Sequence, residues 1–291
     1  ELGKKIGGEI VCADSMQVYK EMNIGTAKVT REEMQGIPHY VMDFVNVDQR
    51  FSVADYKKQA KKAIKQILEK GKIPIVVGGT GLYIDALIYE IEYLEKETDL
   101  AYREQLEQEV EKVGLEELYK KAEQIDAEAT HKISKTDKKR ILRILELYHQ
   151  TGKTKTQLEK ESRQNPLEYN YKVFALTWER ETLYDRINQR VEQMIQQGLI
   201  QEVETIWKKY SYFPTAMQAL GYKEVVEYLE KKVNKEEMIE NIKRETRRYA
   251  KRQLTWFRKN KQVIWLAGEN KQEDNIHTIW EVIRSEEGNK G

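Results

Sequence analysis

EIVCADS at residues 9–15 and KIPIVVGGTG at residues 72–81 are the two stretches that decide the fold. Each has the apolar run typical of a buried parallel strand, and each leaves the sheet through small residues. Between them, residues 52–70 open with Ser52 as a helix cap and keep Ala and Ile at helical spacing up to Gly71. Strand, helix and strand in this order predict an α/β unit, whose ligand crevice lies outside the carboxyl ends of the strands.

The rest of the chain divides into a helical block and a return to the core. Residues 95–165 show helical periodicity with no strand-like stretch, which predicts an inserted helical lobe. The core is then expected to be formed by residues 1–94 and 166–291. Its later elements are expected to be a strand at 172–178, helices on either side of Gly198, a strand at 262–266 and a helix around 275–285.

Composition narrows the class of protein. Hydrophobic residues make up 40% and charged residues 34% of the chain, which is typical of a folded, very soluble protein. No apolar run approaches the length of a bilayer span and no leader opens the chain, so we expect the cytoplasm. A single cysteine, Cys12, and four scattered histidines predict neither a disulfide nor a structural zinc site. Because the first residue is Glu1 rather than Met, we expect the true start upstream.

The whole chain has a net charge of only +1, but a segment near the carboxyl terminus is strongly basic. In KRETRRYAKRQLTWFRKNK, residues 243–261, nine of nineteen residues are Lys or Arg. On a helical wheel one stripe holds Arg244, Arg247 or Arg248, Lys251, Thr255 and Arg258, whereas Ile242, Tyr249, Gln253, Trp256 and Phe257 fall elsewhere. Basic residues interleaved with aromatics suit RNA, and a long solvated helix is the alternative. A smaller cluster of Lys139, Arg140 and Arg143 in the helical lobe predicts a second contact and hence a clamp.

The segment after the first strand carries candidate chemistry. Asp14 can accept a proton from an amino group, and Gln17 can make two hydrogen bonds to an adenine edge. The alternative is that Asp14 merely caps a helix, which spacing alone favours.

Three weaker signals accompany it. GGTG at residues 78–81 follows a strand, so it is either a phosphate contact with Thr80 or a plain turn. Arg186 and Arg190 share a helix face, which suits a departing diphosphate but also an ordinary solvated face. His39, in a predicted loop, is more often structural than catalytic.

Taken in order, six motifs closely resemble those of the bacterial tRNA dimethylallyltransferase (tRNA isopentenyltransferase) family. The motifs are GGEIVCADSMQVYKEMNIGTAK at 7–28, GIPHYVMD at 36–43, IPIVVGGTGLYIDAL at 73–87, DKKRILRILELYHQTGK at 137–153, QALGYKE at 218–224 and RRYAKRQLTWFR at 247–258. Their order and spacing are far more specific than any one motif, and the resemblance spans nearly the whole chain.

The resemblance implies an α/β fold, with a P-loop NTPase-like core built on a parallel sheet plus an inserted all-helical lobe. The core would bind dimethylallyl diphosphate in place of a nucleotide, with Mg²⁺ as the expected cofactor. The lobe would grip the anticodon stem-loop of tRNA, and the adenosine just 3′ of the anticodon would flip into a channel. The family's P-loop, of the GPTxxGKT type, precedes the helix that ends in residues 1–8, so no residue here is assigned to it. We expect a monomer.

The same resemblance assigns roles to individual residues. Asp14 matches the general base at the exocyclic amine, Thr80 a hydroxyl that contacts the substrates, and Arg190 the arginine that steadies the diphosphate. His39 matches a family histidine to which we assign no role. The expected tRNA contacts are Ser15, Met16, Gln17, Arg103, Lys139, Arg140, Ile141, Leu142, Arg143, Gln218, Ala219, Leu220, Gly221, Tyr222, Lys223, Lys251, Arg252, Gln253, Leu254, Thr255, Trp256, Phe257 and Arg258.

Two other function classes stay open at this point. A small-molecule P-loop kinase would share the core fold and explain GGTG, but it leaves the basic aromatic helix without a role. A catalytically silent RNA-binding protein would explain the basic patches but not the Asp14–Gln17 segment.

Overall fold

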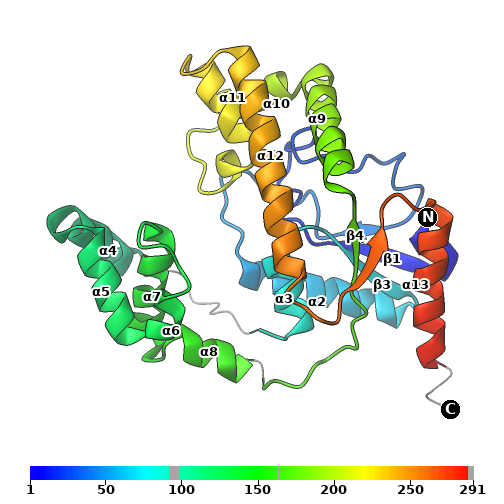
Figure 1. The fold of residues 1–291 in the computed structure, drawn as a ribbon, viewed down its shortest axis with the longest axis horizontal. Coiled ribbons are helices and arrows are strands. Elements are labelled where there is room, and N and C mark those ends of the chain that lie inside the picture. The colour runs from blue at the N-terminus through cyan, green and yellow to red at the C-terminus, as the bar shows by residue number, and fades with distance from the viewer. Residues whose placement is uncertain (92–98, 163, 288–291) are drawn as a thin grey trace. The chain divides into compact units, whose positions relative to one another are not determined.

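The computed structural model describes residues 1–91, 99–162 and 164–287 (Figure 1). Its contacts divide the chain into two compact units, Glu1–Ile84 with Asn170–Gly291, and Asp85–Tyr169. The first unit mixes helices with small parallel sheets, and the described part of the second is helical. The boundary expected between residues 94 and 95 lies outside the described residues. None of the helices described is both long and apolar enough to cross a membrane.

The first sheet has three strands in the order β2-β1-β3, all parallel. The central strand is β1 (Gly8–Cys12), which pairs with β2 (His39–Tyr40) on one side and β3 (Ile73–Val77) on the other. In its register Ile10 lies opposite Ile75, and Cys12 lies opposite Val77. Since β1 and β3 end at the same level, the residues that follow them share one edge of the sheet. The short helix α1 (Leu2–Ile6) precedes β1 at the other end.

The predicted helix between the strands is confirmed as α2 (Val53–Glu69). The hydroxyl of Ser52 accepts a hydrogen bond from the amide of Asp55 at 3.2 Å, and the Asp55 carboxylate accepts from the amide of Ser52 at 2.8 Å. This reciprocal cap satisfies two amides that the first turn of a helix leaves unpaired. The buried face of α2 packs against β1 and β3 and consists of Tyr56, Ala60, Ala63, Ile64 and Ile67.

Glu9 is a buried carboxylate within β1, with 2% of its surface exposed. It accepts hydrogen bonds from Lys72 at 2.6 Å, Tyr40 at 2.7 Å and Lys70 at 3.0 Å. The hydrogen bond from Lys72 has the largest effect and, with the other two partners, lowers the pKa of Glu9 to about 2, although burial opposes it. Because these partners lie on β2 and next to β3, the carboxylate fastens all three strands.

His39 corrects one sequence-based expectation. We predicted a loop around it, but His39 and Tyr40 form strand β2, in register with Ile10 and Val11. The His39 ring nitrogen Nδ1 lies 2.8 Å from the carbonyl oxygen of Ile37. A two-residue strand leaves too short an apolar pattern for periodicity to detect.

The two later strands are present, but they form a sheet of their own. The strands are β4 (Phe174–Thr177) and β5 (Ile264–Ala267), which pair in parallel with each other and not with β1 to β3. An apolar run reveals a strand but not its partner, which is why the sequence did not show two sheets. The helix expected to follow is α13 (Gln272–Glu287).

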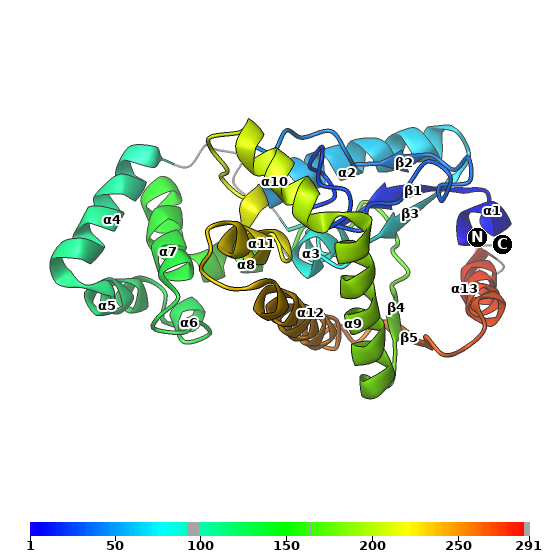
Figure 2. The same cartoon turned by 90° about the horizontal axis from the view of Figure 1, so that it is seen from above.

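The later helices of the first unit pack around a hydrophobic core cluster. They are α9 (Arg180–Gln197), α10 (Leu199–Lys209), the 3₁₀ turn η1 (Ala216–Gln218), α11 (Tyr222–Leu229) and α12 (Lys235–Phe257). Gly198, with φ of 102°, lies between α9 and α10, as expected. Figures 1 and 2 show α9 and α12 side by side. Arg247 bonds Asn188 at 2.7 Å and Lys243 pairs with Glu192 at 2.6 Å, so the two helices run antiparallel.

The second unit is a small helical bundle. Its helices are α4 (Leu100–Val113), α5 (Leu115–Ile125), α6 (Ala127–Thr130), α7 (Lys138–Thr151) and α8 (Lys155–Ser162). Helix α3 (Gly81–Ile88) follows β3, and the boundary between the two units falls within this helix, after Ile84. Buried Asp126 caps α6 through the amide of Ala129 and also accepts from the amide and hydroxyl of Thr156, at 2.8 and 2.7 Å. One carboxylate therefore joins α6 to α8.

Candidate active site

Asp14 lies two residues beyond the end of β1, at the carboxyl edge of the sheet. Its Oδ1 accepts hydrogen bonds from the amides of Met16 at 2.8 Å and Gln17 at 3.2 Å. The capping role is therefore filled by one oxygen. Within the described chain no hydrogen bond involves Oδ2, and the residue is only half-buried. One carboxylate can thus hold its own turn and still present a basic oxygen.

The glycine-rich turn after β3 meets Asp14 at this edge. The hydroxyl of Thr80 accepts a hydrogen bond from the Ser15 amide at 3.0 Å and donates to the Ser15 hydroxyl at 3.3 Å. The amide of Thr80 donates to the carbonyl of Ala13 at 3.2 Å. A Cβ on Gly78 would lie 2.2 Å from that same carbonyl oxygen, so a side chain there is excluded. The turn therefore needs glycine for its close approach to Ala13, the residue before Asp14.

Helix α12 covers the same turn with Gln253 and Trp256, which the resemblance assigned to tRNA contact, and Tyr249 lies on the same face of the helix. Gln253 donates from Nε2 to the carbonyl of Gly79 at 2.9 Å. Burial raises the pKa of Tyr249, and the negative charge of Asp14 raises it further. A Cβ on Gly81 would lie 2.4 Å from Cδ1 of Trp256. The sequence does contain a signal for this face of α12, because positions 249, 253 and 256 follow the i, i+4, i+7 spacing of residues that share one side of a helix.

Gln17 is held by the protein itself. Its Nε2 donates to the carbonyls of Thr26 at 3.0 Å and Ala27 at 3.4 Å, and its Oε1 accepts from the Cys12 thiol at 3.3 Å. Burial raises the pKa of Cys12 to about 11, so the thiol stays protonated and able to donate. An adenine edge that used the Gln17 amide would have to replace these contacts. The expectation that Gln17 reads adenine therefore remains a prediction.

The turn that holds Gln17 is itself held by Glu202 of α10. The Glu202 carboxylate accepts from the amides of Asn23, Ile24 and Gly25 at 3.0, 2.8 and 3.2 Å, and from the hydroxyl of Tyr222 at 2.5 Å. Burial raises the pKa of Tyr222, and the negative charge of Glu202 raises it further. The hydrogen bond to Glu202 therefore gives the Tyr222 side chain a role in holding the fold together.

The residues of QALGYK differ in exposure. Tyr222 is 0% exposed, and Ala219 and Gly221 are also buried. Gln218 is exposed, and Leu220 and Lys223 are partly exposed. Only the last three can offer side chains to an RNA, so the expected tRNA contact narrows to them.

The solvent-exposed residues of α12 are largely basic. Lys251, Arg252, Thr255 and Arg258 are all exposed, whereas Leu254 and Phe257 are partly buried. The Arg252 guanidinium lies 5.7 Å from the centre of the Tyr249 ring. One helix therefore presents exposed basic residues to solvent and also touches the glycine turn.

The two arginines of α9 have different surroundings. Arg186 stacks over Trp178, with 4.2 Å between the guanidinium carbon and the ring centre. Arg190 is exposed, and in the described part of the chain no ion pair or hydrogen bond involves it. The structure describes no contact between Arg190 and the sheet edge, so its diphosphate role remains a prediction.

In the second unit a buried carboxylate organises two of the expected tRNA contacts. Glu146, 2% exposed, accepts from Arg103 at 2.6 Å and pairs with Arg143 at 3.5 Å. Lys139 and Arg140 are exposed at the start of α7, whereas Ile141 and Leu142 are both 0% exposed and belong to the bundle core. Their side chains cannot touch RNA in this conformation, because helix periodicity turns them inward.

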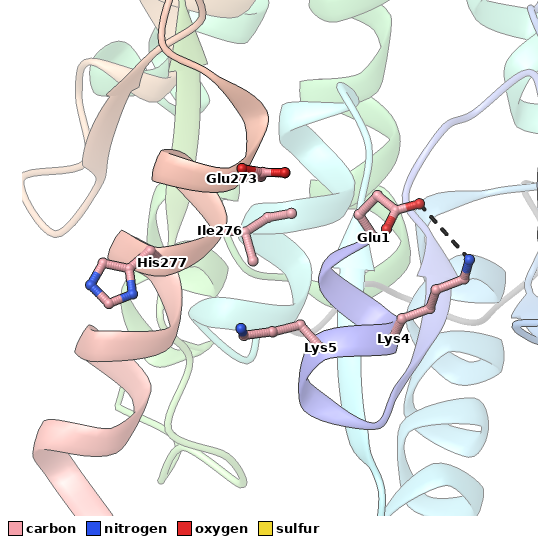
Figure 3. Close-up of a pocket in the computed structure, with 6 residues that line it drawn as sticks. All are labelled: Glu1, Lys4, Lys5, Glu273, Ile276 and His277. Atoms are coloured by element: carbon pink, nitrogen blue, oxygen red, sulfur yellow. Dashed lines mark ion pairs between the residues drawn. The ribbon is translucent and has the colours of Figure 1, made fainter.

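A surface pocket lies elsewhere, between α1 and α13 (Figure 3). It is lined by Glu1, Lys4, Lys5, Glu273, Ile276 and His277. Since α1 precedes β1, this pocket lies at the opposite end of the strand from Asp14. Its acidic and basic side chains are balanced, and we place the candidate site at the carboxyl edge instead.

Comparisons with known proteins match this chain to one family. The family model for IPP transferase matches residues 17–260. A tRNA dimethylallyltransferase of Thermoanaerobacter sp. (strain X514) is 50% identical over 91% of this chain and 85% of its own length. One of Bacillus cereus (strain AH187) is 43% identical over 91% and 83%.

Solved structures agree with these sequence matches. The full-length tRNA isopentenylpyrophosphate transferase of Bacillus halodurans superposes with a TM-score of 0.73 at 40% identity, covering 99% of this chain and 92% of that one. A eukaryotic dimethylallyltransferase acting on tRNA gives a TM-score of 0.73 at 30% identity, covering 91% and 69%.

Proposed function

This chain belongs to the IPP transferase family, and we propose that it transfers a dimethylallyl group from dimethylallyl diphosphate to N6 of an adenosine in tRNA. The adenosine would be the one 3′ of the anticodon. The single observation that carries the proposal is Asp14, with one oxygen fixed by two amides and the other without a hydrogen bond in the described chain, beside the Thr80 hydroxyl system.

The Asp14 carboxylate suits the proton transfer that this reaction needs. The exocyclic amine of adenine is a poor nucleophile because its lone pair is delocalised into the ring. As the N6–carbon bond forms and the allylic carbon–oxygen bond breaks, the N6 proton passes to Asp14 Oδ2 and the electron pair leaves with diphosphate. A positioned base contributes about 10²–10⁴-fold to such a step.

The departing diphosphate requires donors and positive charge. In our proposal Arg190 supplies charge from α9, and the Thr80 turn supplies polar groups at the sheet edge. We also propose a P-loop NTPase-like core, supported by a parallel sheet whose candidate site lies beyond the carboxyl ends of β1 and β3.

Mg²⁺ fits this edge as an ion carried by the diphosphate. No group of three or more His, Cys, Asp or Glu residues gathers to hold a metal in the part of the chain that the structure describes. Mg²⁺ is commonly bound by few protein oxygens together with substrate phosphates and water. Ser15 and Thr80 offer hydroxyl oxygens for this purpose, and the bound ion would neutralise charge on the leaving diphosphate.

The tRNA would be recognised by basic surfaces in both units. The exposed residues Lys251, Arg252 and Arg258 of α12, and Lys139 and Arg140 of α7, suit the phosphate backbone. The target base would leave the stack of the anticodon loop to reach Asp14. We further propose a cytoplasmic monomer, since tRNA substrates are found there; size-exclusion chromatography with light scattering tests the oligomeric state.

The test incubates the full-length protein with dimethylallyl diphosphate, Mg²⁺ and unmodified tRNA, followed by mass spectrometry of the nucleosides. We expect prenylated adenosine. Tight binding of the anticodon stem-loop without a modified product would instead favour the silent RNA-binding protein. Transfer of label from γ-labelled ATP to a small acceptor would favour the kinase, an alternative against which the family membership already stands.

A further inference from the structure

Glu146 is a buried carboxylate at the contact between α4 and α7 in the second unit. Only 2% of its surface is exposed, and it is the one charged residue among the buried residues of α7. Its Oε1 accepts a hydrogen bond from Nη1 of Arg103 on α4 at 2.6 Å. Its Oε2 lies 3.5 Å from Nη1 of Arg143, one turn earlier on α7. Two arginines from different helices therefore meet on the two oxygens of one carboxylate.

The two guanidinium groups keep free donors and remain partly open to solvent. The side chains of Arg103 and Arg143 are 28% and 39% exposed. Arg103 also donates from Nε to Glu107 at 3.0 Å, so it uses two of the five N–H groups of a guanidinium. In the described part of the chain, the side chain of Arg143 makes only the long contact with Glu146. Neighbouring guanidinium groups with free N–H donors match the oxygens of phosphate.

Fastening α4 to α7 is the alternative role of Glu146. A buried carboxylate is a poor device for stability alone, because its desolvation offsets much of what its ion pairs contribute. An apolar residue of similar volume often serves such a position as well or better. Net charge does not explain the cluster either, since Glu107 and Glu146 cancel the formal charge of the two arginines. What the cluster offers is the direction of its donors.

We propose that Glu146 is a positioning residue that holds Arg103 and Arg143 together as one binding site for the phosphate backbone of the tRNA substrate. The two arginines are expected tRNA contacts, whereas the sequence interpretation gave Glu146 no role. A long side chain loses rotamer freedom when it binds, and one that is already held loses less. Glu146 provides this order from the buried side of the helices. The inference rests on the proposed recognition of tRNA by this unit.

Glu146→Gln gives a test whose sign is opposite to that of simple electrostatics. The substitution removes a negative charge beside an RNA-binding surface, so net charge alone predicts tighter binding. Positioning predicts weaker binding, because the NH₂ group of glutamine donates and cannot hold a second guanidinium. Filter binding of unmodified tRNA to the full-length protein should give a Kd about 5- to 10-fold higher, the effect of about one net hydrogen bond. The slope of log K against log salt should fall by about 1, as one phosphate contact is lost.

Glu117→Gln is the matched control for the change in charge. Glu117 lies on α5 of the same unit, is 52% exposed and pairs with Lys120 rather than with either arginine. Its replacement should leave Kd within about 2-fold of the wild type, as for most surface ion pairs. In prenylation assays of Glu146→Gln the loss should appear in KM for tRNA rather than in kcat, because Asp14 and Thr80 belong to the other unit.

A second variant keeps the test decisive if circular dichroism shows that Glu146→Gln is unfolded at the assay temperature. Arg103→Lys keeps the charge, but its single ammonium cannot reproduce the fixed fork of the guanidinium, so Kd should again rise about 5-fold. Unchanged or tighter binding by folded Glu146→Gln overturns the inference, as does wild-type binding by Arg103→Lys. Failure of the proposed function is distinguishable, since it would appear as no prenylated adenosine from the wild type.

Discussion

Replacing Asp14 with asparagine separates the two roles that the structure gives this side chain. The asparagine oxygen can take the place of Oδ1 and accept the amides of Met16 and Gln17, now at 2.8 and 3.2 Å. The amide nitrogen replaces Oδ2 and removes its basicity. Asp14→Asn therefore preserves the turn and abolishes the base, whereas Asp14→Ala removes both.

The magnitudes follow from these contacts. Loss of both capping bonds in Asp14→Ala should cost about 1 kcal/mol of folding free energy, since Asn and Asp cap equally well and Ala does not. For a unit of this size that corresponds to a fall in Tm of about 2–4 °C. Asp14→Asn should keep the wild-type Tm. Both variants should lose about 10²–10⁴-fold in kcat, because both lack the base.

The assay follows prenylated adenosine by nucleoside mass spectrometry at saturating dimethylallyl diphosphate and tRNA. Filter binding gives the Kd for tRNA, which should be unchanged in both variants, and differential scanning fluorimetry gives Tm. Wild-type kcat in Asp14→Asn would refute the assignment of Asp14 as the base. A fall in Tm of Asp14→Asn as large as that of Asp14→Ala would refute the account of the turn.

Three further outcomes are expected. Arg190→Ala should raise KM for dimethylallyl diphosphate or lower kcat by about 10²–10³-fold, as for loss of a donor to developing charge; normal kinetics over a range of diphosphate concentrations would contradict this. Charge reversal of Lys251 and Arg252 should weaken tRNA binding and reduce the slope of log K against log salt by about 2, and an unchanged slope would exclude these contacts. Because the folded pKa of Glu9 is depressed to about 2, its stabilisation is present above pH 4.5 and is lost as pH falls toward 2; Glu9→Gln should lose that part of the acid unfolding profile followed by circular dichroism.

Sequence patterns sufficed where local chemistry decides the structure. Ser52 as a cap at the start of the helical pattern predicted the beginning of α2, and Gly198 predicted the break between α9 and α10. The β-branched run ending in Gly78 marked β3 and the edge that holds the candidate site. In each case the signal lies within a few residues of the structure that it specifies.

Patterns did not suffice where distant parts of the chain meet. Nothing near Gln253 reveals that its side-chain amide reaches the carbonyl of Gly79, since the two residues are far apart in the sequence. Likewise, the sequence interpretation of α12 rested on its exposed basic stripe, whereas the residues that face the glycine turn are Gln253 and Trp256. Tyr222 lies in a motif expected to contact tRNA, yet Glu202 binds its hydroxyl in the core.

A structure of the full-length protein bound to tRNA and an unreactive analogue of dimethylallyl diphosphate tests the central claim most directly. The quantity to measure is the distance from Asp14 Oδ2 to N6 of the extruded adenosine. We predict about 2.6–3.2 Å, the reach of a general base, with the allylic carbon on the far side of N6. An adenosine seated elsewhere, or an Asp14 carboxylate turned away from it, would contradict the account.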